Sequence, residues 1–305
     1  MTFFQMFLAA SLALIGLLLG LAILRAWRVE SPSRRSQRGI ALNTGLRKLV
    51  QDIQLHRGMA SIVLNGDVSF TPRLKVKQSE ITHELRGLTD RLAENRDLVV
   101  GEPWSVIQSG WAQLQSQVLQ MSVPESFEAH SALVLRVVHL MADVAERSHS
   151  DLGTPVARPL SEMLWRRLPE LAEDLGKARA IGSGIAAARK VAGVDRIRLH
   201  FLVNRIRAGL EIMHRAVQQD QAKQLGVEAH QLIHRVDAAV QRLLEMIEHD
   251  LIAVNKPELA AATYFSAATD ALEVVYHLYD SASEGLAHPK GQREVPSGFG
   301  AAQTA

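Results

Sequence analysis

The stretch LRKLVQDIQLHRGMAS, residues 46–61, decides how this chain folds, because its apolar residues recur at helical spacing. At about 100° per residue, Leu49 and Ile53 fall within about 60° of Leu46 on one face of a helix. Arg57 falls about 20° from Leu46, inside the same apolar stripe. A guanidinium keeps its proton in proteins and is costly to bury without a partner. We therefore expect a carboxylate, helix-end carbonyl groups or a bound anion beside Arg57.

The same pattern returns as LPELAEDLGKARAIGS, residues 168–183. The two stretches align without a gap, and Arg57 pairs with Arg179 at an offset of 122 residues (179 − 57 = 122). Leucines alone would match in any two amphipathic helices, but Arg and Ser in one shared register indicate an internal duplication. The paired positions are Leu46 with Leu168, Leu49 with Leu171, Asp52 with Asp174, Ile53 with Leu175, Arg57 with Arg179 and Ser61 with Ser183.

A weaker repeat supports the duplication. SFEAHSALVLRVVHL, from Ser126, aligns with YFSAATDALEVVYHL, from Tyr264, so that Phe127 pairs with Phe265. Each half would then begin with an arginine-bearing helix and end with a phenylalanine-bearing helix.

The rest of the sequence predicts helices and no sheet, because Ala and Leu are abundant and alternating runs of β-branched residues are nearly absent. Long helices with short connections favour antiparallel bundles. We therefore predict an all-α fold, in which an N-terminal transmembrane helix precedes two antiparallel helical bundles related by internal duplication. The further helices are expected at 72–95, 104–121, 196–221 and 225–254.

The first segment carries no charge from Thr2 through Leu24, about 23 residues, which is enough to span a bilayer. It lacks the basic start and the small-residue cleavage site of a signal peptide. Arginines follow it from Arg25 to Arg38 and no basic residue precedes it, which favours a cytoplasmic C-terminal side. The sequence thus predicts a single-pass membrane protein whose C-terminal domain lies in the cytoplasm.

Composition and periodicity divide the chain into five segments. We expect no output domain after the second bundle, so the signal of a sensor would leave through a separate protein. The segments are a transmembrane anchor at 1–28, a basic linker at 29–40, one bundle at 41–152, a second at 160–285 and a disordered tail rich in Gly and Pro at 286–305.

Several classes of function are excluded by composition. The chain has no cysteine, which removes disulfides and thiolate metal sites. Its 34 basic and 32 acidic residues are spread without a basic block, so we expect no nucleic-acid partner. His230 and His234 lie one helical turn apart but have no clear third ligand, so we predict no metal site. We find no catalytic constellation, and we predict neither an enzyme nor a cofactor.

Small residues follow both arginines in the sequence. A glycine costs about 1 kcal/mol in a helix relative to alanine, so these positions indicate close helix packing or open space beside each guanidinium. In one interpretation the two arginines hold a planar oxoanion, because a guanidinium offers paired donors that lysine lacks. The candidate ligand-binding residues are then Arg57, Arg179, Ser61, Ser183, Gly58 and Gly182.

The other interpretation is a non-catalytic scaffold of the inner membrane. Each arginine would then pair internally with a carboxylate such as Asp52, Asp174 or Glu173. Carboxylates on both guanidiniums would favour the scaffold, whereas an open polar site between them would favour the sensor.

The pattern H-R-G-x-x-S followed by LNGD, with a later L-G-x-x-R-A-x-G-S, resembles the nitrate- and nitrite-sensing domain of bacterial receptors and regulators. The segment TYFSAATDALEVV resembles that family's closing helix, so the resemblance covers residues 40–285. His56 stands where the family usually has an acidic residue. A further family arginine would match Arg205 or Arg235.

This resemblance implies paired helical bundles that bind nitrate or nitrite through arginines, here Arg57 and Arg179. It also implies a sensory protein of the bacterial inner (cell) membrane. Its partners would be a small anion and a separate signalling output protein, and the sequence also allows a homodimer.

Overall fold

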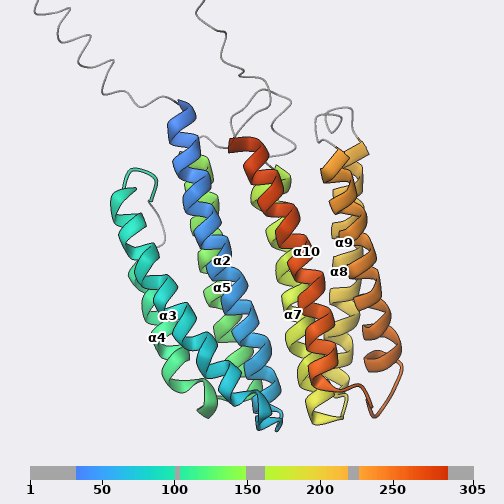
Figure 1. The fold of residues 1–305 in the computed structure, drawn as a ribbon. Coiled ribbons are helices and arrows are strands. Elements are labelled where there is room, and N and C mark those ends of the chain that lie inside the picture. Colours follow the sequence, from blue (N-terminus) through green and yellow to red (C-terminus); the bar gives the residue numbers. More distant parts are fainter. Residues whose placement is uncertain (1–31, 100–103, 149–161, 219–226, 288–305) are drawn as a thin grey trace, which may run out of the picture.

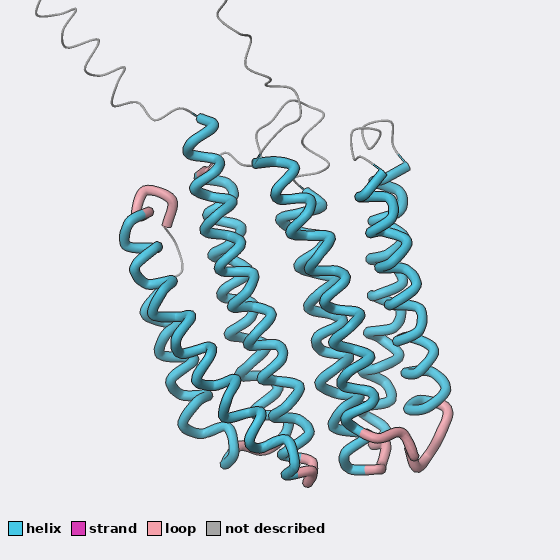
Figure 2. The backbone as a smooth tube through the Cα atoms, in the orientation of Figure 1, coloured by secondary structure: helices cyan, strands magenta, loops and turns pink. Residues whose placement is uncertain are grey.

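The structure is a computed structural model that describes residues 32–99, 104–148, 162–218 and 227–287. Two four-helix bundles stand side by side in it (Figure 1), and every regular element of the described residues is helical (Figure 2). The first bundle contains α2 (Pro32–Leu64), α3 (Thr71–Glu94), α4 (Trp104–Gln117) and α5 (Val123–Arg147). The second contains α7 (Leu168–Ala188), α8 (Gly193–Gln218), α9 (Val227–Met246) and α10 (Ala261–Ala287).

Short helical turns lengthen or join these helices. Tight 3-10 turns follow α2 and α4, and wider π-helical turns precede α7 and follow α9. Their bounds are Val68–Phe70, Val118–Gln120, Met163–Arg167 and Ile247–Ile252.

The two arginine-bearing helices, α2 and α7, pack against each other where the bundles meet. Within its own bundle α2 packs on α5, and α7 packs on α10 in the same way (Figure 1). The predicted apolar stripe is confirmed, because Leu46, Leu49 and Ile53 are fully buried. The matching leucines of α7 are buried as well. The repeated stretches therefore form the centre of the molecule.

The helices expected from sequence agree with α3, α4, α8 and α9 to within a few residues at each end, once the short turns are included. The sequence predicts a linker over 29–40, but α2 already begins at Pro32 and takes in most of that segment. The predicted anchor at 1–28 lies outside the described residues, as does most of the tail at 286–305. Among the helices that the structure describes, none combines the length and apolarity needed to cross a membrane.

A capping box at Ser122 explains why α5 begins at Val123. The Glu125 backbone N–H donates to Ser122 Oγ at 3.4 Å, and the Glu125 carboxylate accepts from the Ser122 backbone N–H at 2.8 Å. These two bonds satisfy donors that the first turn of a helix would otherwise leave unpaired.

Helix α10 packs closely against α7 at Gly182. The buried Tyr264 ring lies against this glycine, so that a Cβ at Gly182 would overlap with the ring. The Tyr264 hydroxyl donates to the Ala178 carbonyl oxygen on the same helix at 2.9 Å. Gly182 therefore serves the packing of α10 on α7.

We predict that Gly182→Ala lowers the free energy of unfolding by about 1–3 kcal/mol, because the added methyl group overpacks the Tyr264 ring. The matched control is Gly87→Ala on α3, where an added Cβ meets nothing within 4 Å. This control should gain about 0.5–1 kcal/mol from its better helix propensity. Urea unfolding of the full chain measures both values, and a Gly182→Ala protein as stable as Gly87→Ala would contradict the packing described.

Candidate functional site

Arg57 of α2 and Arg179 of α7, called the arginine pair below, are buried at the contact between the bundles. Their exposed fractions are 1% and 2%. Each guanidinium lies against a glycine of the opposite helix. A Cβ at Gly58 would lie 3.3 Å from Arg179 Nε, and one at Gly176 would lie 2.9 Å from Arg57 Nη2. Glycine at these two positions leaves room for the guanidinium of the other helix.

A hydroxyl group holds each guanidinium in the same way. Arg57 Nη1 donates to Ser131 Oγ at 2.9 Å, and Arg179 Nη1 donates to Thr269 Oγ1 at 3.2 Å. Both hydroxyl groups donate their own hydrogen to the backbone carbonyl four residues earlier, each at 2.7 Å. Their oxygen lone pairs are therefore left to accept from the arginines.

Phenylalanine rings complete this arrangement. The Arg57 guanidinium carbon lies 5.4 Å from the centre of the Phe127 ring, and that of Arg179 lies 5.3 Å from the centre of the Phe265 ring. These distances are typical of cation–π contacts. The two phenylalanines are the pair aligned in the sequence, so each guanidinium has a hydroxyl group and a phenyl ring beside it.

The repetition fails at one carboxylate. Glu173 of α7 accepts from Arg57 Nη1 at 2.7 Å and from Arg57 Nη2 at 3.2 Å, as a two-point ion pair. The offset of 122 places Gln51 at the equivalent position of α2 (173 − 122 = 51). Gln51 is neutral and accepts from Arg47 Nη1 at 2.7 Å. The second arginine thus has no counterpart of Glu173.

Arg179 has no ion-pair partner of its own among the described residues, although the charge of nearby Glu173 raises its pKa in part. Its Nε and Nη2 atoms are buried, and they have no hydrogen-bond partner in the part of the chain that the structure describes. No carboxylate among those residues lies within ion-pair distance of Arg179. Burial, followed by the charge of Arg57, lowers the pKa of Arg179 to about 10, so it stays protonated at neutral pH. The arginine pair and Glu173 together carry one positive charge in excess.

The fold is similar to that of a known regulator. The solved structure of the NasR transcription antiterminator matches with a TM-score of 0.62 and 18% sequence identity, over 88% of this chain and 73% of that chain. At this identity the likeness shows a shared fold. No protein-family model matches the chain, and no curated protein matches it either.

The other predicted ligand-binding residues are not all at the arginine pair. Ser61 Oγ donates to the Ala180 carbonyl oxygen at 2.7 Å and so ties α2 to α7. Gly182 packs against Tyr264, as described above. Ser183 is fully buried, and its Oγ has no hydrogen-bond partner among the described residues. Of these four residues, Gly58 lies against the guanidinium of the opposite helix.

Of the carboxylates proposed to neutralise the arginines, only Glu173 does so. Asp52 pairs with Lys77 at 2.9 Å, and Asp174 pairs with Arg205 at 2.9 Å. Arg205 is therefore engaged elsewhere, and Arg235 is exposed on α9. The structure thus has a carboxylate on one guanidinium, which is intermediate between the arrangement expected of a scaffold and the arrangement expected of a sensor.

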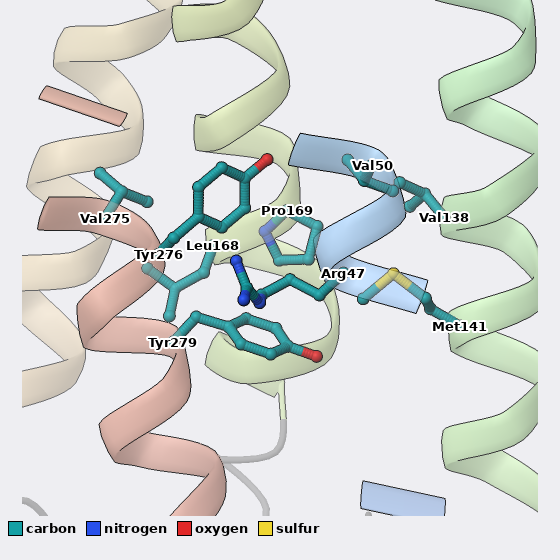
Figure 3. Close-up of a pocket in the computed structure, with 9 residues that line it drawn as sticks. All are labelled: Arg47, Val50, Val138, Met141, Leu168, Pro169, Val275, Tyr276 and Tyr279. Carbon is teal, nitrogen blue, oxygen red and sulfur yellow. The ribbon is translucent and has the colours of Figure 1, made fainter. Parts of the chain in front are cut away.

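A small cavity lies elsewhere along the contact between the bundles (Figure 3). In this view Arg47 reaches between the rings of Tyr276 and Tyr279, and its Nε lies 3.0 Å from Asp280 Oδ1. The cavity volume is about 10 Å³, close to what one water needs. Because Arg47 already has a carboxylate and the space is small, we do not assign a ligand here. The lining residues are Arg47, Val50, Val138, Met141, Leu168, Pro169, Val275, Tyr276 and Tyr279.

Two buried histidines stand beside the arginine pair. His130 Nδ1 lies 2.6 Å from the Ser126 carbonyl oxygen, and His130 Nε2 lies 2.7 Å from His56 Nδ1. A carbonyl only accepts, so His130 Nδ1 carries the hydrogen and His130 Nε2 accepts from His56. Both rings are neutral in this arrangement. No group of three or more His, Asp or Glu residues in the described ranges is placed to hold a metal ion.

We predict that this histidine pair makes the protein less stable as the pH falls below about 6.5. Burial lowers the pKa of His130 to about 3 and that of His56 well below its ordinary value. The unfolded chain therefore binds protons that the native state does not, at a cost of up to about 1.4 kcal/mol per pH unit for each histidine.

Urea unfolding at pH values from about 7 down to about 5 measures this slope. His130→Leu should reduce the slope, whereas His83→Leu, at an exposed position of α3, should leave it unchanged. Equal slopes for the wild-type protein and His130→Leu would contradict the assignment.

Proposed function

We propose that this protein is a sensor that binds a small planar oxoanion, nitrate or nitrite, between Arg57 and Arg179. The observation that carries the proposal is the buried and unpaired edge of Arg179, formed by Nε and Nη2. Burying a charge without a partner costs several kcal/mol, so a site that retains one is expected to acquire a counter-ion.

The chemistry of the site favours a monovalent planar anion. Arg179 offers two N–H groups along one edge of a flat guanidinium, which matches two oxygens of a planar oxoanion. One positive charge is in excess, so an anion of charge −1 would neutralise the site. The resemblance of the arginine motifs to the nitrate- and nitrite-sensing family supports the same ligand class.

Signalling would proceed through the packing of the two bundles. The arginine pair lies where α2 meets α7, and its two positive charges repel each other when no anion is present. An anion between them would remove this repulsion and favour a closer contact of the bundles. We propose that a separate output protein reads this change, and that the uncharged segment Thr2–Leu24 anchors the sensor in the membrane.

We predict that Arg179→Met weakens nitrate or nitrite binding by about ten to a hundredfold. The change removes charge-assisted hydrogen bonds worth about 1.5–3 kcal/mol. Arg179→Lys should restore binding only in part, since it keeps the charge and loses the flat edge. Arg166→Met removes an exposed arginine before α7 and serves as the matched control. Isothermal titration calorimetry of the full chain measures the affinities.

Stability without anion separates this function from a purely structural role. Arg179→Met should unfold at the same temperature as the wild type or higher, because an unpaired buried charge is removed. Arg57→Met should unfold at a lower temperature, because Glu173 loses its partner. A strongly destabilised Arg179→Met protein, with a wild type that binds none of the anions tested, would favour the inner-membrane scaffold.

A further inference from the structure

Glu173 lies between a buried cation and a partly exposed one. Its carboxylate pairs with Arg57, whose side chain is 1% exposed, and its Oε1 also lies 3.6 Å from Lys177 Nζ. Lys177 follows four residues later on α7 and is 34% exposed, whereas Glu173 is 16% exposed. Residues four apart on a helix are side-chain neighbours, so Glu173 can exchange one partner for the other by rotating its own side chain.

We propose that Glu173 is an internal competitor of the anion. Its carboxylate occupies the Nη1 and Nη2 atoms of Arg57 when no anion is bound, and it turns to Lys177 when an anion takes its place. This inference rests on the function proposed above. It adds that Glu173 sets the anion concentration at which the site fills.

The competition follows from shared geometry. A carboxylate, nitrate and nitrite all present two oxygens in a plane to the same pair of guanidinium donors. Glu173 already uses both terminal nitrogens of Arg57, so an oxoanion that binds this Nη1 and Nη2 edge must displace at least one of those bonds. The Arg57 Nε atom has no hydrogen-bond partner among the described residues. Arg179 meets no such obstacle, because its Nε and Nη2 have no partner among the described residues. An incoming anion would therefore engage Arg179 first and displace Glu173 second.

Displacement of Glu173 would also alter the contact between the bundles. Gln54 of α2 donates from Nε2 to Glu173 Oε2 at 2.8 Å, and its Oε1 accepts from the Tyr276 hydroxyl of α10 at 2.7 Å. This chain of hydrogen bonds joins α2, α7 and α10. When Glu173 leaves, the Gln54 amide loses the nearer of its two acceptors and keeps only the Ala172 carbonyl oxygen at 3.5 Å, so occupancy of the site is coupled to the helices on both sides of it.

The test is nitrate binding to the full chain carrying Glu173→Gln, measured by calorimetry beside the wild type. Glutamine is neutral and holds Arg57 less strongly. Because removal of a competing state raises the apparent affinity of a ligand, we expect nitrate to bind at least about tenfold more tightly. Glu170→Gln removes the same charge one turn earlier on α7, where the side chain pairs with Arg166 and Arg167. This control should bind nitrate like the wild type.

A double-mutant cycle tests where the carboxylate goes. Lys177→Met should weaken nitrate binding in the wild-type background, because Glu173 loses its second partner. It should have little effect when Glu173→Gln is also present. Equal weakening in both backgrounds would show that Lys177 acts on nitrate directly, and would overturn the exchange of partners.

A second variant, which keeps the negative charge, tests the proposal even if Glu173→Gln does not fold. Glu173→Asp shortens the side chain and draws it back from Arg57, so it should also bind nitrate more tightly than the wild type. If the wild type binds nitrate and both variants bind it equally or more weakly, Glu173 is not a competitor of the anion. The proposed sensor function would be unaffected by that result. Absence of nitrate and nitrite binding in the wild type and in both variants would instead overturn the proposed function itself.

Discussion

Two guanidinium groups share the buried contact between α2 and α7 with a single carboxylate. The side chains around them are arranged to hold this excess of positive charge. Helix packing at the centre of a protein normally buries apolar side chains or fully paired ions, because an unpaired buried charge is costly. Here Arg57 forms an ion pair with Glu173. Arg179 contacts only a hydroxyl group and a phenyl ring. Such a site favours an anion by charge alone, before any detail of shape is considered.

The duplicated helices hold this imbalance in place. Glycines at 58 and 176 allow the guanidiniums to cross between helices, and Ser61 ties the two backbones together. Hydroxyl and phenyl groups from α5 and α10 hold the guanidiniums from the outer side. Since each bundle contributes one arginine, the site exists only when the bundles are in contact. Anion binding, as proposed, would therefore depend on the packing of the two bundles.

The sequence predicted the helices and the buried arginines because both depend on local periodicity. The apolar stripe of residues 46–61 and its copy placed α2 and α7 correctly, and the aligned phenylalanines marked the helices that flank them. Burial of His56 and His130 as a neutral pair was not predicted, because their contact joins α2 to α5. Nor could spacing show that Glu173, among three candidate carboxylates, would pair across the bundles. Such pairings depend on how far one helix is shifted along its axis relative to the other, and sequence periodicity does not determine this shift.

The most direct measurement is the ¹⁵N and ¹H chemical shift of the Arg179 Nε–H group, followed by NMR while nitrate is titrated against chloride at constant ionic strength. Arg179→Lys assigns the signal by removing it. We expect a saturable shift of this signal with nitrate, larger than that of the exposed Arg166, because the unpaired N–H gains an acceptor. An Arg179 signal that stays fixed with both nitrate and nitrite would contradict this expectation.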